Sequence, residues 1–352
     1  MTSGVLHVVV PGGIDDPARP SGGNTYDRRL CAALPARGRA VHVVEVEAGW
    51  PWSADLGAPA LARELAALPD GATVLVDGLL ASRLPAVMLP ASRRLRVVLL
   101  VHLPVGVDDV LARLPEQQVV GAAAGVVTPS AWCRDWLVWT YGLDPDRVVV
   151  ARPGVDPAEV ATGTGSGAAL LTVGAVSSVK GQDHLLAALA DLQDLPWTWT
   201  CVGSLAVEPE ATVRLRRAAT ALGVADRVLV AGPLGGADLE AAYAGADLLV
   251  LPSRTEAYGM VLTEAIAHGL PVVATDVGGV REALGESPGA GVPGLVVRPG
   301  DPTDLASALR RWLSDPALRE RLRGAALARR SSLEDWSVTA GRVAEVVREV
   351  AA

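Results

Sequence analysis

The sequence predicts an α/β fold with two doubly wound parallel sheets, each in its own domain. The chain has 352 residues, more than a single hydrophobic core usually serves, so two domains are expected. Half of the residues are apolar, which is enough to fill two cores. Short Val- and Leu-rich runs recur, each followed by a turn and a helical pattern. Such near-continuous aliphatic strands are typical of parallel sheets that helices cover on both faces.

Each half of the chain carries its own set of predicted strands. Those of the first half are 5–10, 40–46, 73–78, 96–102, 125–130 and 147–154, and those of the second half are 170–174, 197–203, 227–232, 248–253, 271–276 and 294–300.

The segment 157–167 is the predicted linker, because it is rich in Gly, Thr and Ser and has no apolar period. It separates a first domain over residues 1–156 from a second over 168–334. Residues 335–352 form a predicted amphipathic helix. Two doubly wound domains joined in this way are expected to face each other across a cleft at the carboxyl ends of their strands, where such folds bind ligands.

Composition and charge exclude several classes of protein. Basic side chains number 31 against 39 acidic ones, and neither half is basic, which argues against a nucleic-acid-binding protein. The three cysteines are far apart and have no metal-like spacing, so we expect a reduced, cytoplasmic protein. No charged leader precedes a long apolar run, and no apolar stretch approaches the roughly 20 residues of a membrane span. We therefore expect no integral membrane segment.

Lys180 is the only lysine of the chain, and it lies in the loop between a predicted strand and a predicted helix, "LLTVGAVSSVKGQDHLLAAL". Gly174 and Gly181 let the backbone turn tightly on either side. An ammonium group beside a helix N-terminus is a phosphate-binding arrangement. The alternative is a solvated lysine with no role.

The stretch 251–284 adds two carboxylates to this picture. Glu256 lies in the loop after the strand "LLVLPS", and Glu264 follows eight residues later inside the short helix "MVLTEAIAH". Carboxylates accept hydrogen bonds from sugar hydroxyls, as the acidic residue of dinucleotide folds does with ribose. The backbone N–H groups between them, at the start of the helix, form a predicted anion site. They belong to Gly259, Met260 and Val261.

These elements together resemble the retaining glycosyltransferases of family 4. The resemblance rests on the Glu-x7-Glu element, on "VG…KG…LLAA", on "VVTPSAWCRDWL…RPGVD" and on "GGNTYDRRLCAALPARGRAVHVV", which occur in the family's order over nearly the whole chain. It implies a GT-B fold, in which the first domain binds an acceptor and the second a UDP- or GDP-linked sugar. It also implies that the last helix crosses back onto the first domain. No cofactor beyond the sugar nucleotide and no metal is expected.

The resemblance also implies roles for residues of the second domain. Glu256 is expected to contact hydroxyls of the donor sugar, and Glu264 the ribose diol. Lys180 is expected to neutralise the diphosphate leaving group. Tyr258 and the three backbone N–H groups of the anion site complete the expected donor-binding loop.

One departure from the family pattern affects the leaving-group site. The family usually has an arginine directly after the glycine that matches Gly174, and here Ala175 stands in its place. That change removes a positive charge. Arg254, in the next loop, is the hypothetical substitute and is counted among the donor-binding candidates.

In the first domain, Gly22, Gly23 and Asn24 lie in the loop expected after the first strand. In relatives the matching loop approaches the diphosphate and the acceptor, although a tight turn would use glycine equally well. Asn24 could instead cap a helix over residues 25–34. His102, which closes a strand, matches a histidine near the donor sugar in relatives; a structural histidine is the alternative.

Two further patterns are assigned a structural meaning. Trp132, Trp136 and Trp139 form an i, i+4, i+7 stripe, for which core packing is expected and a sugar- or lipid-binding surface is the alternative. Asp144 and Asp146 have the spacing of metal-binding carboxylates in other transferases. Their surroundings predict a proline-containing turn instead.

The predicted function is that of a retaining hexosyltransferase. It would move a sugar from a nucleotide-diphosphate sugar to an unidentified acceptor, with a small molecule or natural product favoured. Front-face attack is expected, since no Asp or Glu stands out as a nucleophile. The alternatives are a GT-B epimerase or sugar-nucleotide hydrolase, and a catalytically silent sugar-nucleotide-binding subunit.

Overall fold

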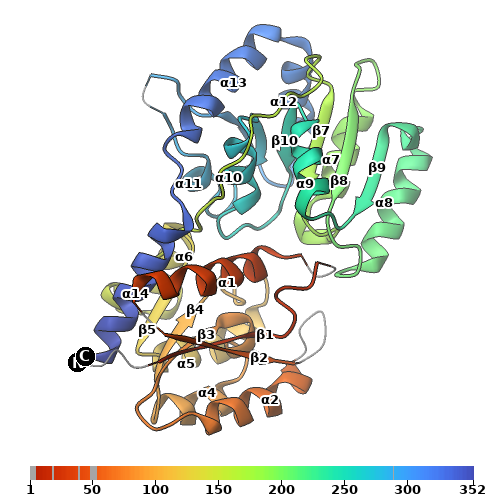
Figure 1. Cartoon of the computed structure of the whole chain (residues 1–352). Coiled ribbons are helices and arrows are strands. Elements are labelled where there is room, and N and C mark those ends of the chain that lie inside the picture. Colours follow the sequence, from red (N-terminus) through yellow and green to blue (C-terminus); the bar gives the residue numbers. More distant parts are fainter. Residues whose placement is uncertain (1–4, 18–19, 39, 48–53, 288) are drawn as a thin grey trace. The chain divides into compact units, whose positions relative to one another are not determined.

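The computed structural model describes residues 5–17, 20–38, 40–47, 54–287 and 289–352. The chain divides into two compact units. The first comprises Met1–Gly154 together with Glu334–Ala352, and the second comprises Val155–Leu333. Each unit is built on one six-stranded parallel sheet with helices on both faces (Figure 1).

The sheet of the first unit has the strand order β2-β1-β3-β4-β5-β6. Its strands are β1 (Leu6–Pro11), β2 (Val41–Val46), β3 (Thr73–Asp77), β4 (Arg96–Leu100), β5 (Gly125–Thr128) and β6 (Val148–Val150). Its helices are α1 (Gly22–Ala33), α2 (Ala54–Ala67), α3 (Gly78–Ala81), α4 (Pro85–Ser92), α5 (Arg113–Ala122), α6 (Ala131–Tyr141) and α14 (Trp336–Ala351). Every residue of the central strand β3 is buried, as expected for an aliphatic strand covered on both faces.

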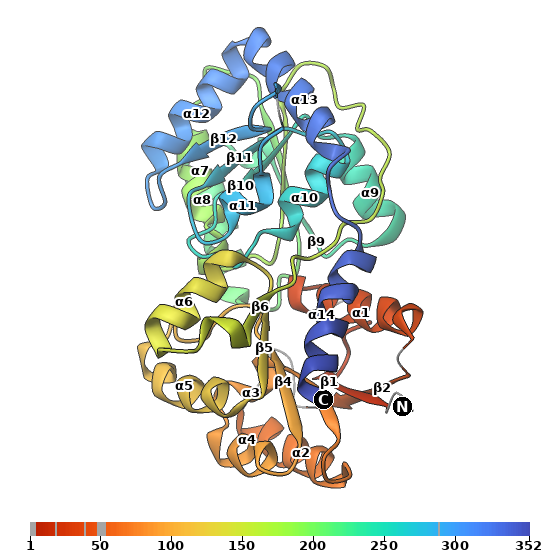
Figure 2. The same ribbon diagram turned by 90° about the vertical axis from the view of Figure 1, so that its left-hand side faces the viewer.

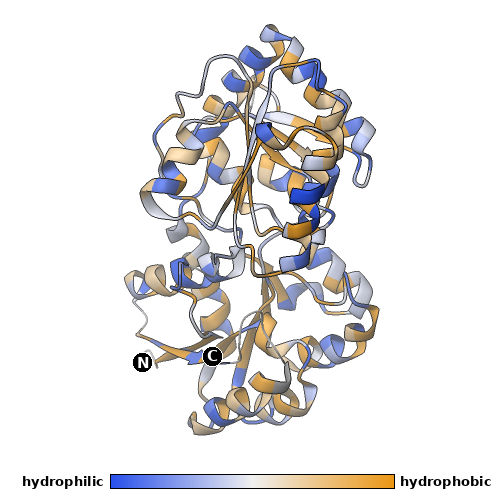
Figure 3. Cartoon of the chain, turned by 90° about the vertical axis from the view of Figure 1, so that its right-hand side faces the viewer, coloured by the Kyte–Doolittle hydropathy of each residue, from blue (hydrophilic) through white to orange (hydrophobic). Residues whose placement is uncertain are grey.

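The sheet of the second unit has the order β12-β11-β10-β7-β8-β9. Its strands are β7 (Ala169–Val173), β8 (Thr198–Val202), β9 (Val228–Gly232), β10 (Leu248–Leu251), β11 (Val272–Thr275) and β12 (Gly294–Val297). Its helices are α7 (Gln182–Ala190), α8 (Pro209–Ala221), α9 (Gly236–Ala244), α10 (Met260–Ala267), α11 (Val280–Leu284), α12 (Pro302–Ser314) and α13 (Pro316–Arg330). Figure 3 shows the apolar strands inside each unit and the mixed polarity of the covering helices. All the expected strands are present, with ends shifted by a few residues.

The last helix, α14, belongs to the first unit although it follows the second in sequence. It packs against α1 and crosses the sheet at β3, β4, β5 and β6 (Figure 2). Its N-terminal Trp336 meets the ring of Tyr26 edge-on at 5.5 Å, and Asp335 caps it by accepting the N–H of Ser337. Val343 and Val347 are fully buried on its inner face. No helix in the described ranges is long and apolar enough to cross a membrane.

The segment predicted as a linker is attached to the second unit. Residues 157–167 contain no helix or strand. The N–H of Ala161 donates to the carbonyl of His268 at 2.8 Å, and that of Gly163 to Ala244 at 2.9 Å. The carboxylate of Asp247 also accepts the N–H of Thr164 at 2.8 Å. These bonds hold the segment against the second unit.

The start of α1 differs from the expectation. The helix begins at Gly22, and its cap is Ser21, whose hydroxyl accepts the N–H of Asn24 at 3.0 Å. The prediction that Asn24 caps a helix over 25–34 is therefore wrong, because Asn24 is itself a buried first-turn residue. Gly22 and Gly23 likewise lie in the first helical turn rather than in a loop.

The prediction that the three tryptophans form a stripe packed in the core is also wrong. On α6 the buried positions are Cys133, Leu137 and Tyr141, whereas Trp139 is 81% exposed. Trp136 is half-buried and packs against the core and against Tyr141. Apolar residues lie on several sides of α6, so the apolar spacing in the sequence was compatible with two different buried faces. The turn expected at Asp144–Asp146 is present as a short 3-10 helix that Asp144 caps.

The buried face of α14 leads to a stability prediction. We expect Val347→Ala to lower the free energy of unfolding of the first unit by about 2 kcal/mol, because it removes two buried methyl groups and leaves a cavity. The control is Glu345→Ala on the exposed side, whose weak ion pair with Arg348 at 3.8 Å should make the change less than about 0.5 kcal/mol. Urea unfolding followed by circular dichroism measures both. Equal midpoints for the two variants would show that the burial of Val347 contributes little to stability.

Candidate functional site

Lys180 and Glu256 form an ion pair at the carboxyl edge of the second sheet. Lys180 ends a 3-10 turn, Ser178–Lys180, that follows β7, and Glu256 lies in the loop after the neighbouring strand β10. The Nζ of Lys180 donates to Oε1 of Glu256 at 2.6 Å. The hydroxyl of Ser253 donates to the same oxygen at 2.7 Å. Lys180 and Glu256, which belong to separate sequence motifs, are therefore in direct contact.

Glycines allow the backbones of these loops to approach closely. Gly181 has φ +66°, and a Cβ there would overlap the carbonyl oxygen of Pro252. Gly278 has φ +53°, and a Cβ there would overlap the carbonyl oxygen of Glu256. The next N–H, that of Gly279, donates to this same oxygen at 3.2 Å. Side chains at these positions would push apart the loops that carry Lys180 and Glu256.

Helix α10 begins directly after the loop of Glu256. Gly259 precedes it with φ +90°, where a side chain would be strained and would press on Leu262. First-turn N–H groups of a helix have no partner within it, so those of Met260 and Val261 stand at the positive end of the dipole, where an anion is favoured. The side chain of Tyr258 is only 5% exposed and packs in the core. Tyr258 can therefore contact a ligand mainly through its backbone atoms.

Glu264, in the second turn of α10, is held by Tyr243 of α9. The phenol of Tyr243 donates to Oε2 of Glu264 at 2.7 Å. The same ring stacks on His268 at 4.5 Å, and Nε2 of His268 lies 3.0 Å from Glu240. Burial raises the pKa of Glu264, although the hydrogen bond from Tyr243 opposes this. The carboxylate is therefore oriented before any ligand arrives.

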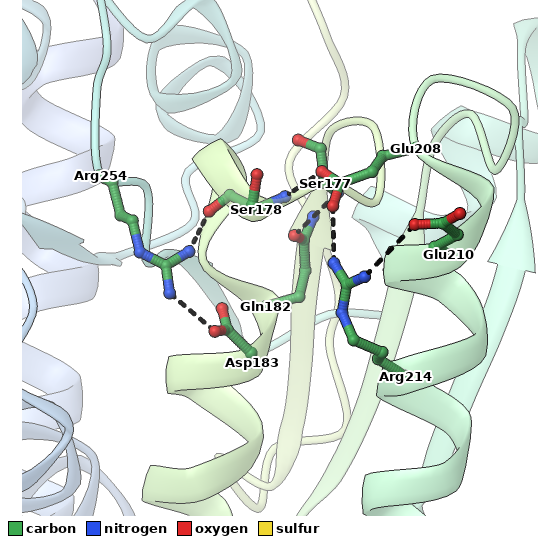
Figure 4. A network of polar contacts seen from close by, with 8 residues as sticks. All are labelled: Ser177, Ser178, Gln182, Asp183, Glu208, Glu210, Arg214 and Arg254. Atoms are coloured by element: carbon green, nitrogen blue, oxygen red, sulfur yellow. Dashed lines mark hydrogen bonds and ion pairs between the residues drawn. The ribbon is translucent and has the colours of Figure 1, made fainter. Parts of the chain in front are cut away.

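Arg254 supports the turn that carries Lys180 (Figure 4). Its backbone N–H donates to the carbonyl of Val179 at 2.7 Å. Its guanidinium donates to Asp183 at 2.7 Å and to the carbonyl of Ser178. Asp183 is partly desolvated, yet these bonds from Arg254 hold its pKa below the usual range. The charge of Arg254 is thus paired with that of Asp183, in the first turn of α7.

Glu208 holds the opposite side of the same turn (Figure 4). It accepts the N–H of Ser178 at 2.7 Å and a guanidinium N–H of Arg214 at 2.6 Å. The Ser178 amide and the Arg214 guanidinium hold the pKa of Glu208 below its usual value. A cavity of about 320 Å³, lined mainly by apolar residues of α7 and α8, lies beside this network. None of the predicted donor-binding residues lines it.

His102 of the first unit follows β4 and meets two buried carboxylates. Its Nε2 lies 3.0 Å from Oδ1 of Asp27, on α1, and 3.9 Å from Oδ2 of Asp77, at the end of β3. A Cβ on Gly23 would lie 3.2 Å from Cδ2 of the ring, so this helical turn packs closely against the imidazole. Gly23 and His102, predicted separately, are therefore neighbours.

The carboxylates change the acidity of His102. Burial by itself would lower its pKa, but the charges of Asp27 and Asp77 and the hydrogen bond that the ring donates to Asp27 raise it to about 9. Burial and the neighbouring Asp27 raise the pKa of Asp77 well above the usual range. The two carboxylates therefore favour the charged form of the imidazole.

Sequence reasoning missed several partners of the predicted residues. Asp27 and Asp77 hold His102, Ser253 holds Glu256, and Tyr243 orients Glu264. A weak signal existed for Asp77, because it ends an aliphatic strand in "TVLVDG" at the carboxyl edge of the sheet. Asp27, in "TYDRRL", reads as a surface charge of an amphipathic helix.

The close approach at Gly278 can be tested directly. We expect Gly278→Ala to lower the free energy of unfolding of the second unit by more than 1 kcal/mol and to displace Glu256, because the added methyl meets the Glu256 carbonyl and the left-handed backbone costs an alanine about 1 kcal/mol. Gly324→Ala, in the open on helix α13, is the control and should be neutral or stabilising. Thermal melting of both variants measures the difference. A Gly278→Ala protein as stable as the native one would mean that the loop has room that the structure does not show.

Comparisons with known proteins give the family. The model "Glycosyltransferase Family 4" matches residues 20–159, and the model "Glycosyl transferases group 1" matches residues 164–329. The D-inositol 3-phosphate glycosyltransferase of Kineococcus radiotolerans is 38% identical over 259 residues, which are 66% of this chain and 59% of that protein. The enzyme of the same name from Frankia alni is 36% identical over 248 residues, 64% of this chain and 59% of its own. The match thus spans about three fifths of each relative's length.

Solved structures share the fold. The sucrose-phosphate synthase of Thermosynechococcus elongatus superposes with a TM-score of 0.80 at 22% identity, covering 99% of both chains. Anabaena HepE in complex with UDP and glucose gives a TM-score of 0.77 at 21% identity, over 97% of this chain and 99% of its own. The chain has the GT-B fold and belongs to the group 1 glycosyltransferases, with a family 4 domain in its first unit.

Proposed function

We propose that this chain is a retaining hexosyltransferase that uses a nucleotide-diphosphate sugar as donor. The observation that carries the proposal is the ion pair of Lys180 and Glu256 at 2.6 Å, beside the first turn of α10. A cation lies in the loop after β7, and a carboxylate, a helix start and a second carboxylate on that helix follow the neighbouring strand β10, at the sheet edge where such folds bind ligands. This combination suits a ligand with a diphosphate between two polyols.

Each group has a place in the proposed donor complex. Lys180 leaves Glu256 to bind the diphosphate, and the N–H groups of Gly259, Met260 and Val261 bind its distal phosphate. Glu256, freed of its lysine but still held by Ser253, accepts hydrogen bonds from the sugar. Glu264, oriented by Tyr243, accepts those of the ribose.

The proposed chemistry needs no nucleophile from the protein. The bond between the anomeric carbon and the phosphate oxygen breaks, and a bond to the acceptor oxygen forms on the same face. The acceptor's proton passes to the departing phosphate. Lys180 and the α10 dipole stabilise the charge that develops on the leaving group, so the reaction is proposed to proceed without a metal. Arg254 contributes by fixing the turn of Lys180, in a chain where Ala175 carries no charge.

Donor binding provides the first test. We expect one of UDP-, GDP- and ADP-sugars to raise the melting temperature by several degrees, since a ligand at a hundred times its dissociation constant adds about 2.7 kcal/mol. Lys180→Ala should weaken that binding about 10- to 100-fold, because a charged hydrogen bond contributes about 1.5–3 kcal/mol. Arg217→Ala, an exposed arginine on α8, is the matched control and should bind as the native protein does. Thermal shift and calorimetry measure both.

The outcomes separate the alternatives. No shift with any nucleotide would mean that the donor site is degenerate. Binding without turnover, whatever the acceptor, would support a silent binding subunit. Turnover without an acceptor would support an epimerase or hydrolase. Only transfer to an added acceptor, with retention seen by NMR of the product, supports the transferase.

For the acceptor we propose a small molecule or natural product with an apolar part. The connection that follows β4 and the first turn of α5 together expose three large apolar side chains. Val110 is 67% exposed, Leu111 88% and Leu114 63%. The neighbouring Asp109 is paired with Arg83 at 2.6 Å, so the positive charge of Arg83 already has an anionic partner. Such a surface favours an apolar aglycone over a phosphate ester.

The proposed acceptor can be tested against the acceptor that the relatives' name gives. With the donor identified above, we expect transfer to apolar alcohols, and we expect Leu111→Ser to raise their KM several-fold with kcat little changed, as for lost uniform binding. Leu229→Ser, on β9 of the second unit and 58% exposed, is the control. Efficient transfer to D-inositol 3-phosphate with no effect of Leu111→Ser would contradict this proposal and favour the acceptor in the names of the curated relatives.

A further inference from the structure

We propose that Asp27 and Asp77 share one proton and hold His102 as an imidazolium, so that its Nδ1 presents a permanent N–H donor. In the terms of the proposed function, that donor faces a ligand at the carboxyl edge of the first sheet. Asp27 and Asp77 are then positioning residues that act through His102.

The geometry fixes the orientation of the ring. Nε2 points to Oδ1 of Asp27 at 3.0 Å, and the adjacent Cδ2 edge faces Gly23. Nδ1 belongs to the opposite edge of the ring and so faces away from α1. The ring of Tyr26 packs edge-on at 5.1 Å, and its own hydroxyl is occupied by the carbonyl of Ala151 at 2.8 Å. The imidazole therefore has little freedom to flip.

Burial requires that the cluster balance its charge. The side chains of Asp27 and Asp77 are only 1% and 3% exposed, and two unshared negative charges at this depth would be very unfavourable. A carboxyl pair that keeps one proton carries one negative charge, and the imidazolium neutralises it. Three groups holding two protons in this way form a neutral buried unit.

An unpaired oxygen shows where the shared proton belongs. Oδ2 of Asp27 is buried and has no hydrogen-bond partner among the described residues. Oδ1 of Asp77 already accepts the N–H of Leu79 at 2.7 Å, so its other oxygen can carry the proton. One nitrogen of His102 and one carboxylate oxygen from each of Asp27 and Asp77 lie within 4.8 Å of one another. A protonated Asp77 can thus donate to Asp27 and satisfy the acceptor that the structure otherwise leaves without a partner.

The surrounding groups reinforce this assignment. In the part of the chain that the structure describes, the titratable groups found against the ring are Asp27 and Tyr26 from α1 and Asp77 from β3. Arg342 of α14 acts electrostatically on Tyr26. The pKa of His102 is raised to about 9, so its charged form persists through neutral pH. Its contribution to stability is complete below pH 6.5 and is lost as the pH rises through about 9.

The test is an NMR titration of His102 in three proteins. With only five histidines in the chain, His102→Gln assigns the resonance. We expect the native ring to titrate near pH 9. Asp27→Asn removes the anion and should bring the midpoint below 7. Asp77→Asn mimics the protonated acid and can still donate to Asp27, so its midpoint should stay near the native one.

Three results would overturn the proposal. They are a native His102 that is neutral at pH 7, an equal fall in Asp77→Asn and Asp27→Asn, and a stoichiometric divalent metal that the purified protein loses in Asp27→Asn. Melting curves of each variant show whether it has folded. A variant that does not fold is replaced by Asp27→Glu, which keeps the anion and should keep the high midpoint.

A second readout separates this proposal from the proposed function. If the protein turns over a donor, kcat/KM should fall above about pH 9 in the native protein and in Asp77→Asn. In Asp27→Asn the fall should come near pH 6.5, a shift that a purely structural role would not produce. The expected NMR midpoints without any turnover would leave this inference standing and remove the transferase.

Discussion

The close approach of main chains at the carboxyl edge of the second sheet is the constraint on which the candidate site depends. Gly203 lies against the carbonyl of Gly174, Gly181 against Pro252 and Gly278 against Glu256. Backbone contact of this kind leaves no room for a side chain, and it places Lys180 and Glu256 at hydrogen-bond distance. The ion pair is thus a product of loop packing, and the networks of Arg254 and Glu208 brace the same turn from both sides.

The two units prepare their charged groups in different ways. In the second unit Lys180 is partly exposed and is paired with the largely buried Glu256. In the first unit His102 faces carboxylates that are sealed from solvent, and its charge is part of the fold. In the proposed function a diphosphate replaces the first arrangement, whereas the second stays in place.

The sequence foretold the sheets because a buried parallel strand needs an unbroken aliphatic run, and few other structures need one. It singled out Lys180 beside Gly181 and Glu256 after a strand end, and the structure brings these two side chains together. It did not foretell Asp27 beside His102, since residues 75 positions apart meet only through the strand order. The stripe of Trp132, Trp136 and Trp139 led to a wrong prediction because α6 is apolar on more than one side. Spacing alone does not show which of these sides is buried.

The position of α14 has a consequence for how the protein is made. The first unit is interrupted by residues 155–333 and completed by 334–352, so the surface of β3, β4 and β5 that Val343 and Val347 cover has no cover during synthesis of the whole second unit. At ribosomal speed those roughly 180 residues take about 10 to 35 s. Throughout that interval the nascent first unit presents an apolar stripe to the cell, and the second unit can fold before the first is whole.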